Sequence, residues 1–465
     1  MIPDLTNYIS PFSWRYGSPE MRQIFSEENK YRLWRRIWVE LARVQHEAGL
    51  VSAQELHDLV KHEKDLDIPR ILEIEEETKH DVVAAIREYA EKATVGGGKI
   101  HLGATSMDIV DNADTLRIKE ALAIVNGRLK TLLSLFAAKI TEYADVPCMG
   151  YTHLQPAEPT TVGYRLATYA QDLLIDTSMY RYIEVMVLKG KGFKGAVGTG
   201  ASYKKVLEGT RMTSVKMDSS VAQALGIDRF PITTQVYPRK VDYLLLTLIT
   251  SIAGSIAKFA EDLRILQSPS IGEWSEPFGK NQVGSSAMPF KKNPVTSEKI
   301  CSLARFIAAL PHVAWENATL SHLERTLDDS ANKRLIMAEA FIALDEILLN
   351  AQKIVSGLVV NKDRITRNLS LYAPFAATET IIIEAVKKGA NRQEMHELLR
   401  NISMIAWQAV QAGKPNSMEK LLVAEKMLIK FLKPSEIKKL MDVSHHMGDA
   451  PERALKLVEE IHKNI

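Results

Sequence analysis

Long runs of helical periodicity constrain the fold of this 465-residue chain more than any other feature. In the stretch 113–144, apolar residues recur every three or four positions, at Leu122, Val125, Leu129, Leu132, Phe136, Ile140 and Tyr143. This spacing predicts one apolar stripe along a helix of about 30 residues. Similar periodicity is found in four further stretches, 161–189, 239–268, 295–318 and 331–356. The chain is therefore predicted to be all-α, with five long helices in a central bundle.

The 239–268 stretch is apolar on nearly every side. Its uncharged run between Asp242 and Lys258 has 15 residues, whereas a membrane-spanning helix needs about 20. We therefore expect a helix enclosed by other helices and no membrane anchor. An isolated five-helix bundle would not need so much apolar surface, so we expect the bundles of several subunits to pack together.

The two flanks of the bundle differ from it. Residues 1–105 hold shorter, charge-rich helices and are predicted to form an N-terminal domain, followed by the central bundle over 106–356. Residues 357–465 are predicted to form a C-terminal helical domain, with breaks near Gly389, Gly413–Pro415 and Pro434. The long connections 190–238 and 269–294 are predicted to be irregular, and loops of that length inside a domain are usually functional.

Composition excludes several classes of protein. The chain is 46% hydrophobic, and 59 Lys and Arg against 57 Asp and Glu give a net charge of +2. Disorder is thereby excluded, and near-neutral charge argues against nucleic acid or anionic lipid as a partner. Two cysteines are too few for a disulfide framework, and no basic residue precedes Arg15, so we expect no signal peptide and a cytoplasmic protein.

The 269–294 connection has the composition of an anion-binding loop. It ends in GSSAMPFKKNP, from Gly284 to Pro294, where adjacent serines are followed by Lys291 and Asn293. Such a loop can gather backbone N–H groups, an ammonium and an amide around one carboxylate. On composition alone, a flexible connector between helices is an equally good interpretation.

As a motif, this string resembles the signature of the fumarase/aspartase superfamily, whose members eliminate fumarate from succinyl compounds. HLGATSMD (101–108) and GYTHLQPAEPTT (150–161) resemble two further conserved blocks of that superfamily, in the same order. The resemblance covers essentially the whole chain. It implies three helical domains, a central bundle that assembles into a homotetramer, and no metal or organic cofactor.

Four other strings are similar to the adenylosuccinate lyase family, in its animal-type form: WRYGSPEM (14–21), ETKHDVVA (77–84), TQVYPRKVD (234–242) and LERTLDDSANKR (323–334). This resemblance implies β-elimination of fumarate from adenylosuccinate to give AMP, and from succinyl-aminoimidazole-carboxamide ribotide (SAICAR) to give AICAR. Argininosuccinate lyase, or another lyase of the same superfamily, is the alternative.

The resemblance also implies the roles of particular residues. Ser285 is the base, His153 is the general acid, and Thr105 and Ser106 hold either a succinyl carboxylate or the phosphate. Lys299 stands where the animal-type enzymes carry an arginine, and Arg and Lys are not interchangeable at a bidentate site. The remaining implied substrate-binding residues are Arg15, Tyr16, Lys79, His80, Asp81, His101, Gln235, Lys291, Asn293, Arg325, Ser330 and Arg334.

The last of these strings also has a physical interpretation. Ser330 lies just before the predicted helix 331–356, with Arg334 one turn inside it and Arg325 on the approach. A helix N-terminus with a hydroxyl and two guanidinium groups suits a phosphate. An ordinary N-cap with salt-bridged arginines is the alternative.

Two rival functions come from other classes. Glu77-x-x-His80 and Glu459-x-x-His462 fit the spacing used by helical di-iron carboxylate proteins, although neither pair falls on the five long helices. A non-catalytic scaffold would not require Ser285, Lys291 and His153 together. The other histidines weighed, which have no such motif support, are His46, His57, His62, His396 and His445.

The predicted helix 113–144 separates two of the candidate blocks. It begins after Thr105 and Ser106 and ends before His153, and about 30 helical residues span about 45 Å. If both blocks bind one substrate molecule, they come from different subunits. The family pattern places His153 and Ser285 on different chains as well, which the sequence alone leaves open.

Overall fold

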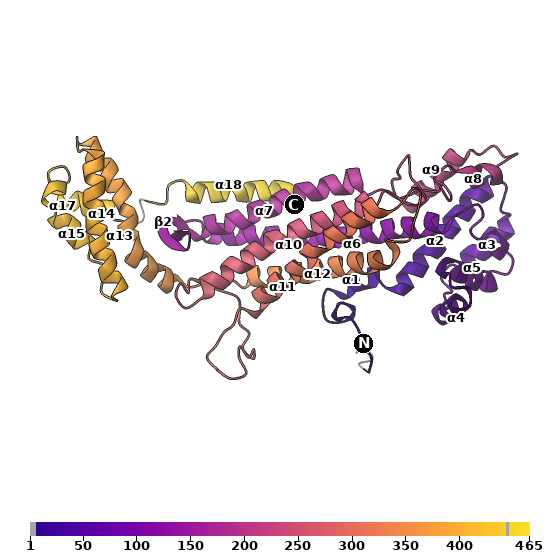
Figure 1. Ribbon diagram of the computed structural model, residues 1–465, viewed down its shortest axis with the longest axis horizontal. Helices are drawn as coiled ribbons and strands as arrows, with labels where there is room; N and C mark the ends of the chain where they lie inside the picture. Colours follow the sequence, from indigo (N-terminus) through magenta and orange to yellow (C-terminus); the bar gives the residue numbers. More distant parts are fainter. Residues whose placement is uncertain (1–5, 443–445) are drawn as a thin grey trace. The chain divides into compact units, whose positions relative to one another are not determined.

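The computed structural model describes residues 6–442 and 446–465, so residues 1–5 and 443–445, including His445, lie outside the described residues. The predicted all-α fold is confirmed (Figure 1). The five predicted long helices are all present, with ends within a few residues of the prediction except at the start of the first and the end of the second, where a π-helical turn (Ile183–Val187) follows the α-helix. They are α6 (Ser106–Glu142), α7 (Val162–Tyr182), α10 (Lys240–Gln267), α11 (Val295–Leu320) and α12 (Ser330–Ser356).

The chain divides into two compact units. Unit 1 comprises Met1–Leu129, Asp176–Gly254 and Ser302–Leu349, and unit 2 comprises Lys130–Ile175, Ser255–Cys301 and Asn350–Ile465. Each of the five long helices contributes residues to both units. The predicted division into three domains, at residues 105 and 356, remains a prediction.

Short helices form the N-terminal part of unit 1, as predicted. They are α1 (Pro19–Ile24), α2 (Glu27–Glu47), α3 (Ala53–Lys61), α4 (Ile68–Thr78) and α5 (Asp81–Lys92), with short 3-10 turns at Pro11–Ser13 and Gly97–Lys99. Serine N-caps begin α1, α2 and α3, which satisfies backbone N–H groups that the helix leaves unpaired. Trp34, Trp38 and Tyr89 are buried in the core of this part.

The connection 190–238 is less irregular than predicted. It contains α8 (Ala201–Val206) and α9 (Ser214–Leu225), and α9 packs against α2. Helix α9 is capped by the Thr213 side chain and ends at Gly226, which has a φ of 70°. Its buried face (Met217, Val221 and Leu225) joins the core of unit 1.

Unit 2 contains a β-hairpin that the sequence did not predict. Strands β1 (Pro147–Thr152) and β2 (Gln155–Thr161) pair antiparallel, with Thr152 opposite Gln155. A second pair, β3 (Trp274–Ser275) and β4 (Val359–Val360), is very short. Between β3 and α11 the chain runs as an extended loop, as predicted, and Figure 1 shows it projecting from the ends of α10 and α11.

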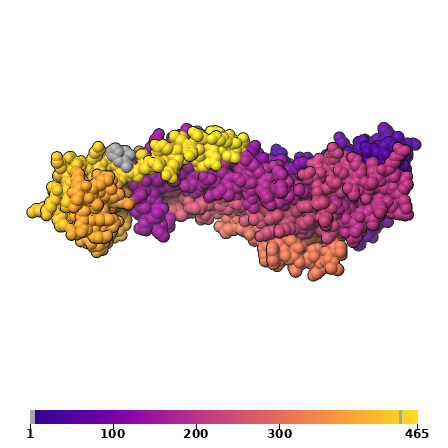
Figure 2. All heavy atoms as spheres, turned by 90° about the horizontal axis from the view of Figure 1, so that it is seen from above, coloured from indigo at the N-terminus to yellow at the C-terminus, as the bar shows by residue number. Residues whose placement is uncertain are grey.

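The C-terminal helices of unit 2 end where the sequence predicts breaks. They are α13 (Lys362–Lys387), α14 (Arg392–Gln411), α15 (Met418–Ala424), α16 (Lys426–Ile429), α17 (Pro434–Leu440) and α18 (Ala450–Asn464). Gly389 and Gly413 follow α13 and α14 with positive φ, and Pro434 begins α17. Helix α18 contacts β2 and lies at the surface, in yellow in Figure 2.

By length and composition alone, three of the described helices could cross a membrane. They are α6, α10 and α13, whose most apolar 18-residue windows have mean hydropathies of 1.3, 1.6 and 1.3. The uncharged run of 15 residues is shorter than the apolar window of α10, which has 18 residues. Composition therefore does not exclude a membrane-spanning helix, contrary to the expectation from the sequence. Half of the α10 window is buried inside the protein.

Candidate active site

His153 stands at the tip of the β1–β2 hairpin. Because Thr152 pairs with Gln155, the hairpin loop has two residues, His153 and Leu154, with φ of 54° and 58°. Positive φ at both positions is typical of a type I′ turn, which favours Asn and Gly rather than these side chains. Both side chains are exposed. The hairpin therefore presents the His153 imidazole at the surface on a strained backbone.

Arg165 on α7 is hydrogen-bonded to this hairpin. Its guanidinium donates to the main-chain oxygen of Met149 on β1 and pairs with the buried carboxylate of Glu273 at 3.3 Å. Glu273 also accepts a hydrogen bond from Asn368 on α13 at 2.9 Å. A buried polar network therefore ties the hairpin to the residue that precedes β3.

Ser285 lies in the loop between β3 and α11 and organises a turn there. Its Oγ accepts hydrogen bonds from the N–H groups of Ala287 (3.3 Å) and Met288 (3.1 Å). The Asn293 side chain donates to the Gly284 main-chain oxygen at 3.0 Å. A Cβ on Gly284 would stand 1.9 Å from the main-chain oxygen of Lys291, so only glycine fits there. The turn around Ser285 is thus closed against the Lys291–Asn293 segment.

In unit 1, the turn between α4 and α5 meets α12. Lys79 ends α4 in the left-handed conformation, and His80 caps α5 by accepting the Val83 N–H at 3.4 Å. Asp81 pairs with Arg334 of α12 at 3.2 Å. Helix α12 begins at Ser330 itself, so Ser330 is its first residue and not, as predicted, the residue before it. The structure therefore brings Arg334 to the ETKHDVVA string.

Arg325 is oriented by a carboxylate. Its guanidinium lies 3.1 Å from Asp329, which also accepts a hydrogen bond from Arg239 at 2.5 Å. The Gln235 N–H donates to the main-chain oxygen of Glu324 at 3.3 Å. The TQVYPRKVD and LERTLDDSANKR strings are therefore neighbours. Within the described residues, Arg325 Nε is buried without a hydrogen-bond partner.

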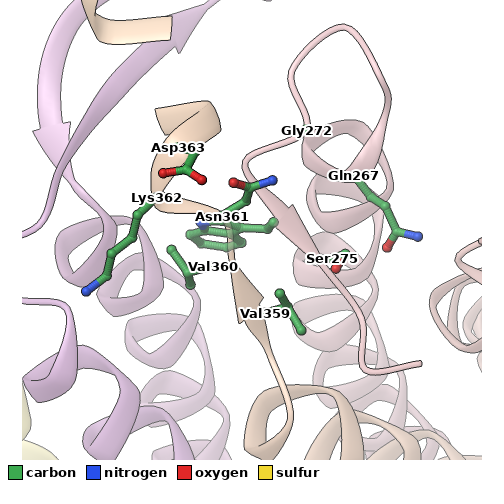
Figure 3. A pocket seen from close by; sticks show the side chains of 9 residues that line it. Gln267, Gly272, Ser275, Val359, Val360, Asn361, Lys362 and Asp363 are labelled. Carbon is green, nitrogen blue, oxygen red and sulfur yellow. The ribbon is translucent and has the colours of Figure 1, made fainter. Parts of the chain in front are cut away.

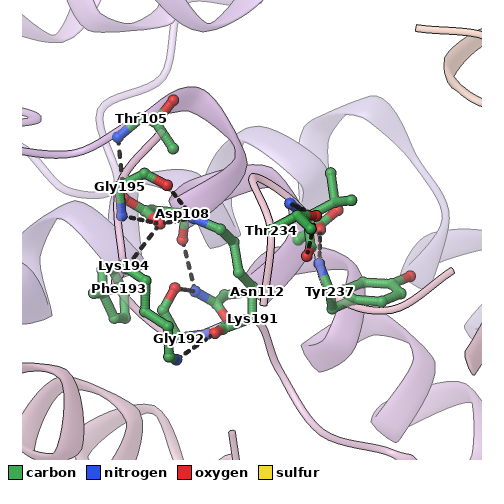
Figure 4. Close-up of polar contacts among 12 residues, drawn as sticks. Thr105, Asp108, Asn112, Lys191, Gly192, Phe193, Lys194, Gly195, Thr234 and Tyr237 are labelled. Atoms are coloured by element: carbon green, nitrogen blue, oxygen red, sulfur yellow. Dashed lines mark hydrogen bonds and ion pairs between the residues drawn. The ribbon is translucent and has the colours of Figure 1, made fainter. Parts of the chain in front are cut away.

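Thr105 is fixed by a buried carboxylate. Asp108, in the first turn of α6, accepts hydrogen bonds from Thr105 N–H (3.0 Å), Gly195 N–H (3.2 Å) and Tyr203 Oη (2.9 Å). It also pairs with the buried Lys191, and Figure 4 shows this convergence. The turn that carries Thr105 is thereby anchored to the chain around Gly195.

His101 is half-buried beside α2. Its Nδ1 accepts a hydrogen bond from Trp38 Nε1 at 3.0 Å. Burial lowers the pKa of His101 to about 4, because the charged imidazolium loses hydration. At neutral pH this imidazole is therefore uncharged and serves as a hydrogen-bonding group.

The remaining predicted residues have fewer described contacts. Arg15 is exposed, with its guanidinium 5.4 Å from the centre of the Trp14 ring, and Tyr16 packs on Phe12. Lys291 is exposed, and Lys299 lies in the second turn of α11.

The predicted residues thus fall into two sets. Unit 2 carries His153, Ser285, Lys291, Asn293 and Lys299, and unit 1 carries all the others. A cavity of about 460 Å³ lies among β3, β4 and the start of α13 and is lined by none of them (Figure 3). Among the described residues, no three His, Cys, Asp or Glu side chains form a cluster that could hold a metal ion.

Sequence reasoning missed the carboxylates that position these residues. Asp108, Asp111 and Asp114 recur every three positions in α6 and lie on one helical face. Asp111 accepts from the Tyr237 N–H (2.8 Å) and pairs with Arg239 (3.1 Å). The recurrence of Asp at every third position in the first turns of α6 was the signal that could have found these carboxylates.

Comparison with known proteins decides the family. Residues 15–308 match the family model described as "Lyase", and residues 374–456 match "Adenylosuccinate lyase C-terminus". The chain is 37% identical to adenylosuccinate lyase of Saccharomyces cerevisiae, over 99% of this chain and 95% of that protein. It is 36% identical to adenylosuccinate lyase of Schistosoma mansoni, over 90% and 88%.

The chain belongs to the adenylosuccinate lyase family. Its fold is also that of a fumarate lyase from Mesorhizobium sp. BNC1, with a TM-score of 0.84 and 22% identity over 97% of this chain and 99% of that one. The predicted resemblance to the adenylosuccinate lyase family, within the lyase superfamily, is therefore confirmed. Arg325, Ser330 and Arg334 lie between the two matched segments, in a region that the full-length relatives of the family cover.

Proposed function

We propose that this chain eliminates fumarate from adenylosuccinate to give AMP, and from SAICAR to give AICAR. The observation that carries the proposal is the full-length similarity to adenylosuccinate lyases from yeast and flatworm. The hairpin and the loop of unit 2 add support, because each presents one candidate catalytic side chain outside the packed core.

In the proposed reaction, Ser285 removes a proton from the carbon next to a succinyl carboxylate. The electron pair left on that carbon forms the new C=C bond as the C–N bond breaks, which yields fumarate. A serine hydroxyl is a weak base, so it needs a dry, electropositive site. The Lys291 ammonium and the N–H groups of the loop are suited to supply that and to stabilise the developing negative charge.

His153 is proposed to protonate the departing nitrogen of the purine or carboxamide. General acids of this kind typically contribute about 10²–10⁴-fold to a rate. The exposed tip of a two-residue hairpin leaves the imidazole accessible to a substrate. No step of this reaction calls for a metal or an organic cofactor.

The residues of unit 1 are proposed to bind the nucleotide. Ser330 and Arg334, at the start of α12, offer a hydroxyl, a guanidinium and the positive end of a helix to the phosphate. Arg325 is oriented beside them by Asp329. Thr105 and Ser106, at the start of α6, suit either a succinyl carboxylate or the phosphate. The other proposed substrate-binding residues are Arg15, Tyr16, Lys79, His80, Asp81, His101, Gln235, Asn293 and Lys299.

We further propose a cytoplasmic homotetramer whose active sites are shared between subunits. Helix α6 has 37 residues and so is about 55 Å long. One substrate molecule is too short to contact, in the same chain, both the residues before the start of α6 and those after its end. The α6 and α10 windows bury only 44% and 50% of their residues inside one chain, and helices of other subunits would cover the rest.

The absorbance change on adding adenylosuccinate or SAICAR to the purified protein tests the activity, with argininosuccinate as the control substrate. We expect fumarate release from both purine compounds and none from argininosuccinate. Absence of release from both purine compounds would contradict the proposal.

A further inference from the structure

One buried carboxylate joins the two ends of the loop that carries Ser285. Glu276, which is 4% exposed, follows β3. Its carboxylate accepts hydrogen bonds from the N–H groups of Thr296 and Ser297, each at 3.1 Å, and from Ser297 Oγ at 3.3 Å. These groups form the first turn of α11, where a negative charge is stabilised by the helix dipole. The two ends of the loop, at Glu276 and at Thr296–Ser297, are therefore adjacent.

Gln267 ties the same two arms together from the end of α10. Its Oε1 accepts the Glu276 N–H at 3.0 Å, and its Nε2 donates to the Lys292 main-chain oxygen at 2.9 Å. Figure 3 labels Gln267 near Ser275 of β3. We call Gln267, Glu276, Thr296 and Ser297 the loop anchor.

The loop anchor joins both ends of the segment that lies between Glu276 and Thr296 to the helices. The segment holds Ser285, Lys291 and Asn293, and from Ser286 to Lys292 its side chains are exposed. Its internal ties, between Gly284 and Asn293 and around Ser285, fix the shape of the tip but not its place relative to the helices.

We propose that Glu276 is a positioning residue for the catalytic base, acting through the loop, with Gln267 as a second support. This inference rests on the proposed function, because it assigns Glu276 to the placement of Ser285. A misplacement of about 1 Å at a reacting group can cost about 10²-fold in rate. A carboxylate that served only as a helix cap would affect stability and leave turnover unchanged.

The test compares Glu276→Gln with a matched control, Asp58→Asn. Asp58 also accepts two main-chain N–H groups, from Val95 (2.8 Å) and Gly96 (2.9 Å), but lies in unit 1. In Glu276→Gln the amide keeps one acceptor oxygen and turns an N–H donor toward a second N–H group. We expect kcat to fall about 10- to 100-fold, with AMP affinity changed by less than about threefold. Asp58→Asn should keep its kcat.

Limited trypsin digestion gives a readout that does not depend on activity. The loop contains the exposed Lys280, Lys291 and Lys292, and cleavage there should be about tenfold faster in Glu276→Gln than in the wild type, because the anchored ends open more often. Gln267→Leu removes the second support without a buried charge, and it should show the same changes more weakly. It serves as the decisive variant if Glu276→Gln does not fold.

A kcat within twofold of the wild type in both loop-anchor variants would overturn the inference, and so would equal losses in Asp58→Asn. Unchanged tryptic cleavage would also overturn it. A wild-type protein that releases no fumarate overturns the proposed function instead, and the digestion still decides whether Glu276 fixes the loop.

Discussion

At the residue scale, this chain places its candidate catalytic groups where local structure is costly. His153 and Leu154 both adopt positive φ without glycine, which costs about 1 kcal/mol or more per residue. Gly284 is required because the loop closes on itself beside Ser285. The sequence motifs predicted these residues, but not the backbone conformations, because the hairpin register and the loop contacts arise from tertiary packing.

The nucleotide phosphate provides the first residue-scale prediction. Arg334→Ala removes a charge-assisted hydrogen-bond donor, worth about 1.5–3 kcal/mol, so AMP affinity should fall roughly ten- to a hundredfold while fumarate affinity changes little. Ser330→Ala should act in the same direction. Titration calorimetry with AMP and with fumarate measures both affinities.

Arg400→Ala is the matched control, because Arg400 is an exposed helical arginine whose ion pair, like that of Arg334, measures 3.2 Å. It should leave AMP affinity unchanged. Equal losses of AMP and fumarate affinity in Arg334→Ala would indicate a role in the fold instead.

His101 provides a pH prediction. Its pKa is about 4 in the folded protein against an ordinary 6.5, so the unfolded chain binds more protons and stability falls as pH drops below about 6.5. Linkage gives a loss of about 2 kcal/mol between pH 7 and pH 5 from this residue. In the His101→Asn variant, the free energy of unfolding measured by urea denaturation should therefore fall by about 2 kcal/mol less between about pH 7 and about pH 5 than it does in the wild type. The same pH dependence in both proteins would show that His101 does not titrate as its burial requires.

At the element scale, helices were predictable and strands were not. The apolar period of three and four residues located α10 and α12 to within a residue at each end. The hairpin at 147–161 was missed because Gly150, Pro156 and Pro159 indicate irregular chain, and two short strands bury too little to show a period. Pro159 lies on β2 opposite Met149, and both residues of this pair are buried.

The Ser285 loop provides the prediction at this scale. Gly284→Ala would place a Cβ 1.9 Å from the Lys291 main-chain oxygen, so the turn cannot close, and kcat should fall about 100-fold. Gly279→Ala is the control in the same loop, since its Cβ would meet its nearest neighbour at an ordinary 3.7 Å. Steady-state kinetics of the two variants distinguishes them, and a Gly284→Ala enzyme as active as Gly279→Ala would show that the turn does not govern catalysis.

At the scale of the whole molecule, the candidate residues belong to two units of one chain. His153 and Ser285 are both in unit 2, and the proposed nucleotide-binding residues are mostly in unit 1. The family motifs indicate which residues form the site, and that assignment remains a prediction. They could not predict the supporting ion pairs of Asp108, Asp111 and Asp329, because a helical period does not reveal which buried charges meet.

Sharing of active sites between subunits gives the prediction for the assembly. His153→Gln and Ser285→Ala proteins, mixed with subunit exchange, should recover roughly a quarter of wild-type activity if acid and base come from different chains. In a random mixture of equal amounts, about half of the sites receive an intact His153 and, independently, about half receive an intact Ser285, so roughly a quarter receive both. Mass spectrometry confirms the exchange. Activity that stays at the level of the parents after exchange would place both residues within one chain.

The central claim is that Ser285 and His153 catalyse the elimination of fumarate. Fumarate release from adenylosuccinate, followed by absorbance for the wild type and for the Ser285→Ala and His153→Gln variants, tests it most directly. We predict turnover by the wild type and a loss of about 10³-fold or more in each variant, with the helical circular dichroism unchanged. A correctly folded variant that keeps more than about a tenth of wild-type turnover would contradict the assignment of that residue.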